Sequence, residues 1–478
     1  MSNLSLLTDF YQLSMMQGYW DNGLGEDEVV FDVFFRKNPC NNGFTLIAGV
    51  ESVIDYIENL AFDEADLDYL KSVGFQDGFL DKLRHFRFTG TIDGVPEGTV
   101  MFPQEPVMRV RANCFEAQLI ESTILNLINY QSLIATKAAR ICEAAQGDAV
   151  FEFGLRRAQG PDAAILGSRA AYIGGCVATS NVLAGQQFGI PVVGTHAHSW
   201  IQKFDSELEA FRAYAKTYPD KCLLLVDTYN TLKSGVPNAI TVFQELRQQG
   251  YEPKGIRIDS GDLSYLTKVA REQLDAAGFP NAAIIASSDL DEDKIHSLKM
   301  QGARIDSWGV GTNLITSSNC PALGGVYKLV AAEQKGVLEP KIKISDNPQK
   351  ITNPGYKKVT RIYDESGLFA LADLIMLEDE QIDETEPLTI FHPIYTWKTK
   401  TFRRYSLKEL MIPYFHQGKA VYQKQSVRNV RSHAQLELDS LWPEYKRLQF
   451  PQIYKVDLSK KLWKLKQEMM HQHQHQEP

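Results

Sequence analysis

The sequence predicts an α/β protein, in which an irregular (β/α) barrel follows an N-terminal α+β lobe and precedes a smaller C-terminal domain. Between residues 149 and 313, short apolar segments rich in β-branched residues recur, and each has Gly, Ser, Thr or Asp at or near its end. Helix-like stretches separate these segments at intervals of roughly 20–40 residues, as in the strand–helix units of a parallel sheet. At least six such units favour a barrel over a flat doubly wound sheet.

Residues 1–112 are predicted to form the α+β lobe. The first helix begins after a cap at Thr8 or Asp9, because apolar residues then recur at helical spacing. In chain order, the predicted elements are a helix over 10–20, a strand over 29–36, helices over 44–60 and 64–73, and short strands within 87–112.

Residues 113–345 are assigned to the barrel domain. Two helices over 115–146 open it, with a predicted break at Asn126, Asn129 and Tyr130. The predicted barrel strands are AVFEFG (149–154), PVVGT (191–195), CLLLVDT (222–228), GIRIDSGD (255–262), AAIIASSD (282–289) and RIDSWGVGTN (304–313).

Residues 346–478 are assigned to the C-terminal domain. Around the boundary, GVYKLVAAE, PKIKIS and KVTRIYD are strand-like and separated by polar turns. The tail HQHQHQEP (471–478) is polar and repetitive, so it is predicted to be disordered. A metal role for it is not expected, because His473 has no partners at fixed geometry.

The composition indicates a soluble protein with no nucleic-acid or membrane partner. A net charge of −9 over 478 residues offers no basic surface to an anionic polymer or bilayer. The six cysteines are scattered without a CxxC pair, which predicts free thiols in a reducing compartment. The N-terminus lacks a basic leader, and no apolar run reaches about 18 residues. We therefore expect a cytoplasmic location.

The polar ends of the predicted strands should meet, because the carboxyl ends of barrel strands face one mouth. Among them, GTHAHS contains the pair His196 and His198. An HxH pair at a strand end is typical of barrel metal hydrolases, but these need further histidine ligands from later strands. No histidine occurs between residues 199 and 295, and His296 lies in a helical run. A zinc site is therefore disfavoured, and a purely structural role for both imidazoles stays open.

Other strand ends suit a flat anion and a sugar phosphate. Phe153 could stack on a planar ring, and Arg156 could bind a carboxylate or phosphate. Arg257 and Asp259 share one strand face and would both point into the mouth. The polar groups of later strand ends could contact phosphate, ribose or Mg²⁺; these are Ser287, Asp289, Gly309, Gly311 and Thr312.

Several long motifs in order resemble the nicotinate phosphoribosyltransferase family. They are LLTDFYQLSM, FEFGLRRAQGPDAA, ATSNV, GTHAHSW, RIDSGDL and GVGTN followed by GGVYKLV. The resemblance implies a type II phosphoribosyltransferase fold and a homodimer with shared active sites. It also implies an enzyme that makes nicotinate mononucleotide and diphosphate from nicotinate and phosphoribosyl diphosphate. ATP hydrolysis would be coupled, with Mg²⁺ required.

The resemblance also implies residue roles. His198 would be transiently phosphorylated by ATP, whereas His196 is given no role. Arg257, helped by Thr195, would pair with the nicotinate carboxylate. The pyridine ring would lie between Phe153 and Tyr11 of the partner subunit. The remaining contacts, to sugar phosphate, diphosphate, ribose or Mg²⁺, would come from Arg156, Asp259, Ser287, Asp289, Gly309, Gly311 and Thr312, and the Mg²⁺ ligands are not assigned.

Ser180, in ATSNV, is expected to influence substrate choice. Relatives that use nicotinamide carry an Asp in this segment, and a carboxylate there would repel the anionic substituent on the nicotinate ring. Ser180 therefore favours nicotinate. The alternatives are a nicotinamide phosphoribosyltransferase, a barrel metal hydrolase with bound zinc, and a homologue without catalysis whose His198 never carries phosphate.

Overall fold

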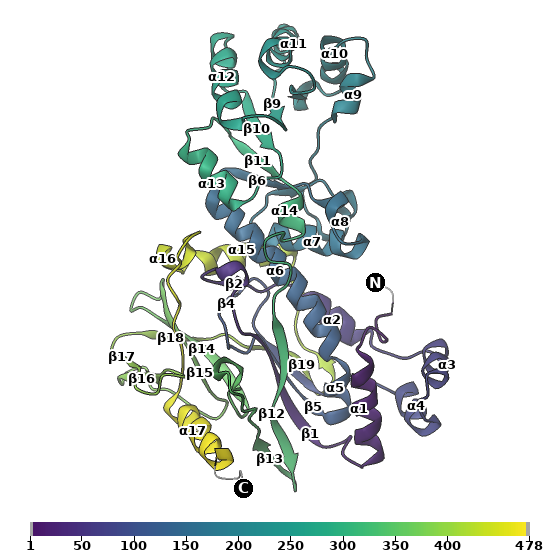
Figure 1. The fold of residues 1–478 in the computed structure, drawn as a ribbon, viewed down its shortest axis with the longest axis vertical. Helices are drawn as coiled ribbons and strands as arrows, with labels where there is room; N and C mark the ends of the chain where they lie inside the picture. The colour runs from purple at the N-terminus through teal and green to yellow at the C-terminus, as the bar shows by residue number, and fades with distance from the viewer. Residues whose placement is uncertain (1–2, 475–478) are drawn as a thin grey trace. The chain divides into compact units, whose positions relative to one another are not determined.

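The computed structural model describes residues 3–474, which form two compact units (Figure 1). The first unit comprises Met1–Leu133 and Ala322–Pro478, and the second comprises Ile134–Pro321. The boundary between Leu133 and Ile134 falls inside helix α6, Glu121–Ala145. The predicted division into three domains is a different partition of the chain and stays a prediction.

The first unit contains a seven-stranded antiparallel sheet. Its order is β13-β12-β1-β5-β3-β19-β20, and β1 lies between β12 and β5. All residues of β1 after Glu28 are buried, because the strand is covered on both faces. The strands are β1 (Glu28–Phe35), β3 (Thr91–Gly94), β5 (Met108–Asn113), β12 (Gly325–Gln334), β13 (Val337–Pro340), β19 (Ile412–His416) and β20 (Lys419–Ala420).

A second sheet of this unit has six strands in the order β17-β16-β21-β15-β14-β18. Arg361 on β14 is fully buried and forms ion pairs of 2.7 Å with Asp373 and Glu437, which satisfy its charge inside the core. The strands are β14 (Lys357–Tyr363), β15 (Ala370–Leu377), β16 (Leu388–Phe391), β17 (Thr399–Phe402), β18 (Ser406–Glu409) and β21 (Val456–Leu458); β2 (Thr45–Leu46) and β4 (Val100–Met101) form a separate pair.

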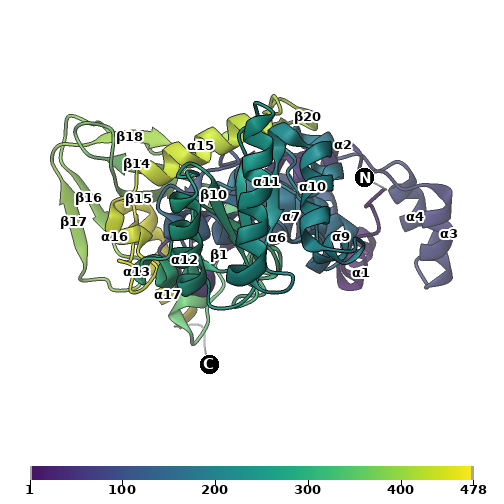
Figure 2. The ribbon, with the colours of Figure 1, turned by 90° about the horizontal axis from the view of Figure 1, so that it is seen from above.

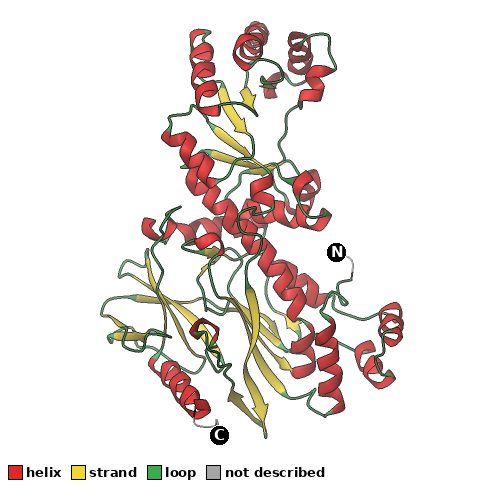
Figure 3. Ribbon diagram, viewed as in Figure 1, coloured by secondary structure: helices red, strands yellow, loops and turns green. Residues whose placement is uncertain are grey.

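The first unit also contains helices, which are red in Figure 3. Their bounds are α1 (Phe10–Asp21), α2 (Val50–Glu58), α3 (Glu64–Ser72), α4 (Asp77–Arg84), α5 (Cys114–Leu119), α15 (Val427–Asp439), α16 (Pro443–Lys446) and α17 (Lys460–Gln474), with short 3-10 turns at Pro39–Asn41 and Pro348–Lys350.

The second unit is built on a parallel six-stranded sheet that curls into a half-barrel. Its order is β7-β6-β11-β10-β9-β8, and every neighbouring pair is parallel. The strands are β6 (Ala149–Glu152), β7 (Ala178–Thr179), β8 (Leu223–Leu225), β9 (Gly255–Ile258), β10 (Ala283–Ser287) and β11 (Ser307–Val310). This confirms the α/β fold class predicted from the strand–helix rhythm.

Helices of the second unit connect consecutive strands. Amphipathic helices such as α11 and α12 bury one face, and Figure 2 shows α10, α11 and α12 side by side. The helices are α7 (Pro161–Ile173), α8 (Val182–Phe188), α9 (His198–Gln202), α10 (Glu207–Thr217), α11 (Val236–Gln248), α12 (Leu263–Ala276), α13 (Glu292–Met300) and α14 (Thr312–Ile315), with short turns at Leu155–Arg157, Pro219–Lys221 and Thr231–Gly235.

Several predicted elements differ from the structure. The predicted break at Asn126, Asn129 and Tyr130 is wrong: α6 runs through these residues, and the break lies at Ile120 between α5 and α6. Buried apolar residues continue at helical spacing across the polar ones, so burial holds the helix together. The predicted helix over 44–60 begins only at Val50, after strand β2.

The segment PVVGT is not a regular strand. It has one isolated bridge, between Val192 and Thr179 of β7. Pro191 lacks an N–H group and Gly194 has no side chain to pack, so a longer ladder is disfavoured at this edge. β7 was missed because it has only two residues, and the helix α4 was also missed. PKIKIS contains no strand after Pro340.

The prediction that the tail from residue 471 is disordered is partly wrong, because helix α17 extends to Gln474. Residues 475–478 lie outside the described residues. The six cysteines are thiols that form no disulfide, as predicted. Among residues 3–474, no helix is long and apolar enough to cross a membrane.

Candidate active site

The carboxyl ends of the parallel strands bring most of the predicted residues to one edge of the second unit. In-register parallel pairing aligns β6, β11, β10 and β9, so the loops after these strands emerge together. The last residues of these strands and the loops after them carry Phe153 and Arg156, then Gly309, Gly311 and Thr312, then Ser287 and Asp289, then Arg257 and Asp259. Thr195, His196 and His198 follow the extended segment beside β7, and Ser180 follows β7 itself.

Phe153 is held against the neighbouring strand end. Its main-chain N–H donates to the carbonyl of Val310 at 2.7 Å, and its ring lies nearly parallel to that of Phe151, with 6.0 Å between centroids. A Cβ on Gly309 would come within 2.7 Å of the Phe153 ring. Glycine at position 309 therefore leaves space for this aromatic side chain, a packing role that the sequence did not indicate.

Arg257 on β9 carries a partly buried positive charge without a carboxylate partner among the described residues. Its Nη1 donates to Thr195 Oγ1 at 2.6 Å, and its Nη2 donates to the carbonyl of His196 at 3.2 Å. Its Nε is buried without a hydrogen-bond partner. Burial lowers the pKa of the Arg257 guanidinium, while Asp259 and Asp227 act in the opposite direction. Such a group favours the approach of an anion.

Asp227 organises the neighbouring strand ends, although sequence analysis gave it no role. Its Oδ2 accepts from the main-chain N–H of Asp259 at 2.9 Å and from the hydroxyl of Ser260 at 2.6 Å. Its Oδ1 is buried without a hydrogen-bond partner. The signal was present in the sequence, because Asp227 ends the predicted strand CLLLVDT in the same way as Asp259 ends its own.

Asp259 is itself fixed from the opposite side. Its Oδ1 accepts from the hydroxyl of Ser287 at 2.5 Å, so the ends of β9 and β10 are joined through side chains. After Ser287 the chain takes positive φ angles at Ser288 and Asp289. The carbonyl of Asp289 accepts from the side chains of Lys294 at 2.6 Å and Asn313 at 2.7 Å. These bonds hold a strained turn in place.

His198 is the first residue of α9 and is half-buried. Its Nδ1 lies 3.0 Å from Oγ1 of Thr228, a residue that follows β8. If Nδ1 carries the proton of the neutral ring and donates to this hydroxyl, Nε2 keeps its lone pair. Thr228 is a second residue that the sequence analysis did not single out.

Ser180 adjoins a buried carboxylate. Glu152 on β6 accepts from Ser168 Oγ at 2.9 Å, from Thr179 Oγ1 at 2.6 Å and from the N–H of Gly154. The N–H of Ser180 donates to the main-chain carbonyl of Glu152 at 3.0 Å. These bonds fix the chain on both sides of Ser180, whose side chain remains partly exposed.

Not all predicted residues are brought together. Arg156 is exposed. Its positive charge adds to the effect of burial in lowering the pKa of Arg257, so Arg156 acts on the site through its charge. Tyr11 belongs to α1 of the first unit, where it is 51% exposed. His296 lies on α13, in the helical run that the sequence predicted, and it is exposed.

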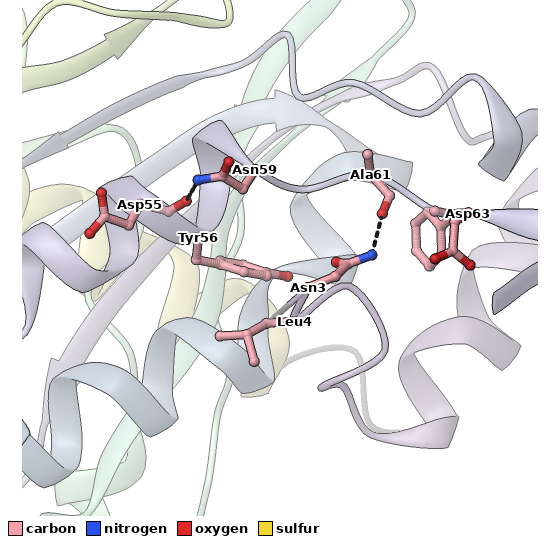
Figure 4. Close-up of a pocket in the computed structure, with 8 residues that line it drawn as sticks. Asn3, Leu4, Asp55, Tyr56, Asn59, Ala61 and Asp63 are labelled. Carbon is pink, nitrogen blue, oxygen red and sulfur yellow. Dashed lines mark hydrogen bonds between the residues drawn. The ribbon is translucent and has the colours of Figure 1, made fainter. Parts of the chain in front are cut away.

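The first unit has a pocket of its own, of about 580 Å³, shown in Figure 4. Asn3 donates from its amide to the carbonyl of Ala61 at 3.0 Å beside it. None of the predicted site residues lines this pocket, which is formed by Asn3, Leu4, Asp55, Tyr56, Asn59, Ala61, Phe62 and Asp63.

Comparison with known proteins assigns the chain to a family. Family models described as the nicotinate phosphoribosyltransferase N-terminal domain, family and C-terminal domain match residues 6–129, 149–377 and 356–466. A nicotinate phosphoribosyltransferase of Bacillus subtilis is 49% identical over 471 residues, covering 98% of this chain and 96% of the relative. This chain belongs to the nicotinate phosphoribosyltransferase family.

Other members of the nicotinate phosphoribosyltransferase family agree with this. The Caenorhabditis elegans relative is 38% identical, over 96% of this chain and 92% of its own. The crystal structure of human nicotinic acid phosphoribosyltransferase superposes with a TM-score of 0.85 at 31% identity, over 97% of this chain and all of that one. The resemblance noted in the motifs is therefore confirmed along nearly the whole chain.

Proposed function

We propose that the protein transfers the phosphoribosyl group of phosphoribosyl diphosphate to nicotinate, giving nicotinate mononucleotide and diphosphate for NAD biosynthesis. ATP hydrolysis is coupled to this transfer through a phosphohistidine at His198. Family membership supports the transferase activity, and the names of the relatives support nicotinate as the substrate.

The observation that carries the proposal is the guanidinium of Arg257, which donates to Thr195 and has no carboxylate partner among the described residues, at the sheet edge where Phe153 also lies. The carboxylate of nicotinate could bind the guanidinium of Arg257. The pyridine ring of nicotinate could then lie against the aromatic side chain of Phe153. Two directional contacts would orient the pyridine nitrogen, and orientation of reactants supplies much of the rate of a two-substrate reaction.

In the proposed transfer, the pyridine nitrogen attacks the anomeric carbon of the ribose, and the bond to diphosphate breaks. Positive charge develops on the sugar while negative charge leaves with the diphosphate. Donors aimed at the departing group stabilise it best when they are fixed in advance. Arg156, the hydroxyl of Thr312 and the main chain of Gly309–Gly311 are the proposed donors. Asp259 and Asp289 are proposed to contact the ribose.

In the proposed coupling step, Nε2 of His198 attacks the γ-phosphorus of ATP and ADP leaves. Thr228 supports this assignment, because its contact to Nδ1 leaves Nε2 as the available nucleophile. Water later cleaves the phosphorus–nitrogen bond and restores the free imidazole.

The acidic residues of the site fit Mg²⁺ as a partner of the substrates. Mg²⁺ usually binds one or two carboxylates together with substrate phosphates and waters. In residues 3–474, no group of three or more His, Cys, Asp or Glu could hold a metal ion. The unpartnered Oδ1 of Asp227 and the exposed carboxylate of Asp289 suit the smaller ligand set. Bound Mg²⁺ would neutralise charge on the leaving diphosphate.

A homodimer belongs to the same proposal. Tyr11 and Phe10 are exposed on α1, at 51% and 59%, so a partner subunit has accessible aromatic side chains to cover. We propose that Tyr11 covers the second face of the pyridine in the partner subunit's site.

The test uses ATP labelled at the γ-phosphate, with Mg²⁺ and the full chain. Acid-labile label on the wild-type protein, lost in His198→Ala and discharged by both remaining substrates with nucleotide formation, is the expected result. Nucleotide formation without label would overturn the phosphohistidine step alone. The absence of both label and product would overturn the enzyme assignment, and product from nicotinamide only would favour the alternative substrate.

A further inference from the structure

His196 closes an open edge of the parallel sheet. β8 is the last strand of the sheet, and the N–H of Val226 donates across to the carbonyl of Arg257 on β9. Successive N–H groups of a strand point to opposite sides, so the N–H of Leu225 points to the edge. Nε2 of His196 accepts this N–H at 3.3 Å. An unpaired edge donor is thereby satisfied by a side chain.

The surroundings of His196 favour this acceptor role. The side chain is 7% exposed and its ring packs against Tyr214, with 4.7 Å between centroids. Burial, with the charge of Arg257 adding to it, lowers the pKa of His196 to about 4. The imidazole is therefore neutral at physiological pH, and Nε2 can accept when Nδ1 carries the proton.

The segment that His196 anchors also holds Arg257. Among residues 3–474, the guanidinium of Arg257 donates hydrogen bonds to two consecutive residues, to the hydroxyl of Thr195 and the carbonyl of His196. In the described part of the chain, no main-chain hydrogen bond joins Gly194–His196 to a neighbouring strand. The imidazole of His196 is thus the polar link between this segment and β8.

We propose that His196 is a positioning residue, which sets the place of the Arg257 guanidinium, and so of the nicotinate carboxylate, by binding the N–H of Leu225. This inference rests on the proposed function. It assigns a role to the first histidine of GTHAHS, which the sequence analysis left without one. His196 does not touch substrate, and it acts through Thr195 and Arg257.

Two variants of similar size separate the acceptor from the packing. His196→Gln places a side-chain oxygen near the position of Nε2, whereas His196→Leu fills the space without an acceptor. We expect His196→Leu to raise the nicotinate KM about tenfold, as for the loss of one hydrogen bond. The KM for phosphoribosyl diphosphate and kcat should change less than about twofold, and His196→Gln should restore the nicotinate KM to within about twofold.

Amide hydrogen exchange at Leu225 provides a readout that does not depend on activity. The Leu225 amide should be protected in the wild-type protein and in His196→Gln, and exchange faster in His196→Leu. His196→Ala serves as the acceptor-free variant if His196→Leu does not fold.

Equal exchange of Leu225 in all variants would overturn the contact. Faster exchange with an unchanged nicotinate KM, or with an equal rise in the KM of both substrates, would overturn the positioning role. A wild-type protein that forms no nucleotide would overturn the proposed function and the nicotinate role with it. If the Leu225 amide still exchanged faster in His196→Leu than in the wild type, the hydrogen bond from Leu225 to His196 would stand, and only the proposed function would have failed.

Discussion

The hydroxyl of Thr228 lies 3.0 Å from Nδ1 of His198, although 30 residues separate them in the chain. The contact joins the loop after β8 to the start of α9 and orients the imidazole proposed to accept phosphate. Such a contact in the fold offers a direct way to test the role of His198.

Thr228→Val should lower kcat roughly 3–10-fold, because an imidazole without its partner is less well oriented, and one hydrogen bond contributes about 1 kcal/mol. The nicotinate KM should stay near the wild-type value. Steady-state kinetics and the yield of acid-labile phosphate measure both effects. Thr217→Val, at the exposed end of α10, is the matched control. An unchanged kcat would remove Thr228 from the mechanism.

Arg257→Ala should weaken nicotinate binding by on the order of 2–5 kcal/mol, since the substrate carboxylate loses its partly buried cation. The nicotinate KM, or direct calorimetry, measures this loss. Arg212→Ala removes an arginine from an exposed ion pair with Glu245 and should leave binding unchanged. Equal nicotinate KM values for wild type and Arg257→Ala would contradict the carboxylate assignment.

Ser180→Asp should lower kcat/KM for nicotinate and raise it for nicotinamide. A carboxylate at this position repels the nicotinate anion and can accept from an amide. The main-chain bond from Ser180 to Glu152 does not involve the side chain, so the local fold should persist. Ser180→Asn has the same shape without the charge, and it separates charge from size. Unchanged values for both substrates would exclude Ser180 from substrate choice.

Gly309→Ala should reduce kcat/KM for nicotinate by about tenfold. The added Cβ would meet the Phe153 ring at 2.7 Å and displace the surface proposed to stack on the pyridine. Gly78→Ala, in α4 with nothing within 4 Å of its added Cβ, is the control. If Gly309→Ala retains full kcat/KM, the Phe153 ring has no role in binding.

The pH dependence of stability should contain a contribution from His196. Its pKa is lowered from 6.5 to about 4 by burial, so the folded state favours the neutral ring. The contribution of His196 to the free energy of unfolding is fully present above pH 6.5 and is lost as the pH falls toward 4. The total loss is limited to roughly 3 kcal/mol. Thermal unfolding between pH 7.5 and pH 4.5 should show a smaller loss in His196→Gln than in wild type. His296→Gln, exposed on α13, should follow the wild type.

The sequence determined the fold class and most of the strand ends, because burial leaves a local record. Apolar β-branched runs ending in Gly, Ser or Asp located β6, β8, β9, β10 and β11 within a few residues. Their polar ends converge, since parallel strands share one direction. This rule placed Arg257, Asp259 and Ser287 at one edge without any structure.

Tertiary structure decided the rest, because partners distant in the chain leave no local pattern. Asn126 and Asn129 look like a helix break, yet α6 continues through them because its neighbours are buried. His196 looks like a possible metal ligand, but its nitrogen meets the N–H of Leu225 across the open sheet edge. Asp227 accepts the main-chain N–H of Asp259, which lies 32 residues further along the chain. Only the fold brings these two residues within hydrogen-bonding distance. Hydrogen bonds between side chains and distant main chain depend on positions in space, which residue type and spacing do not encode.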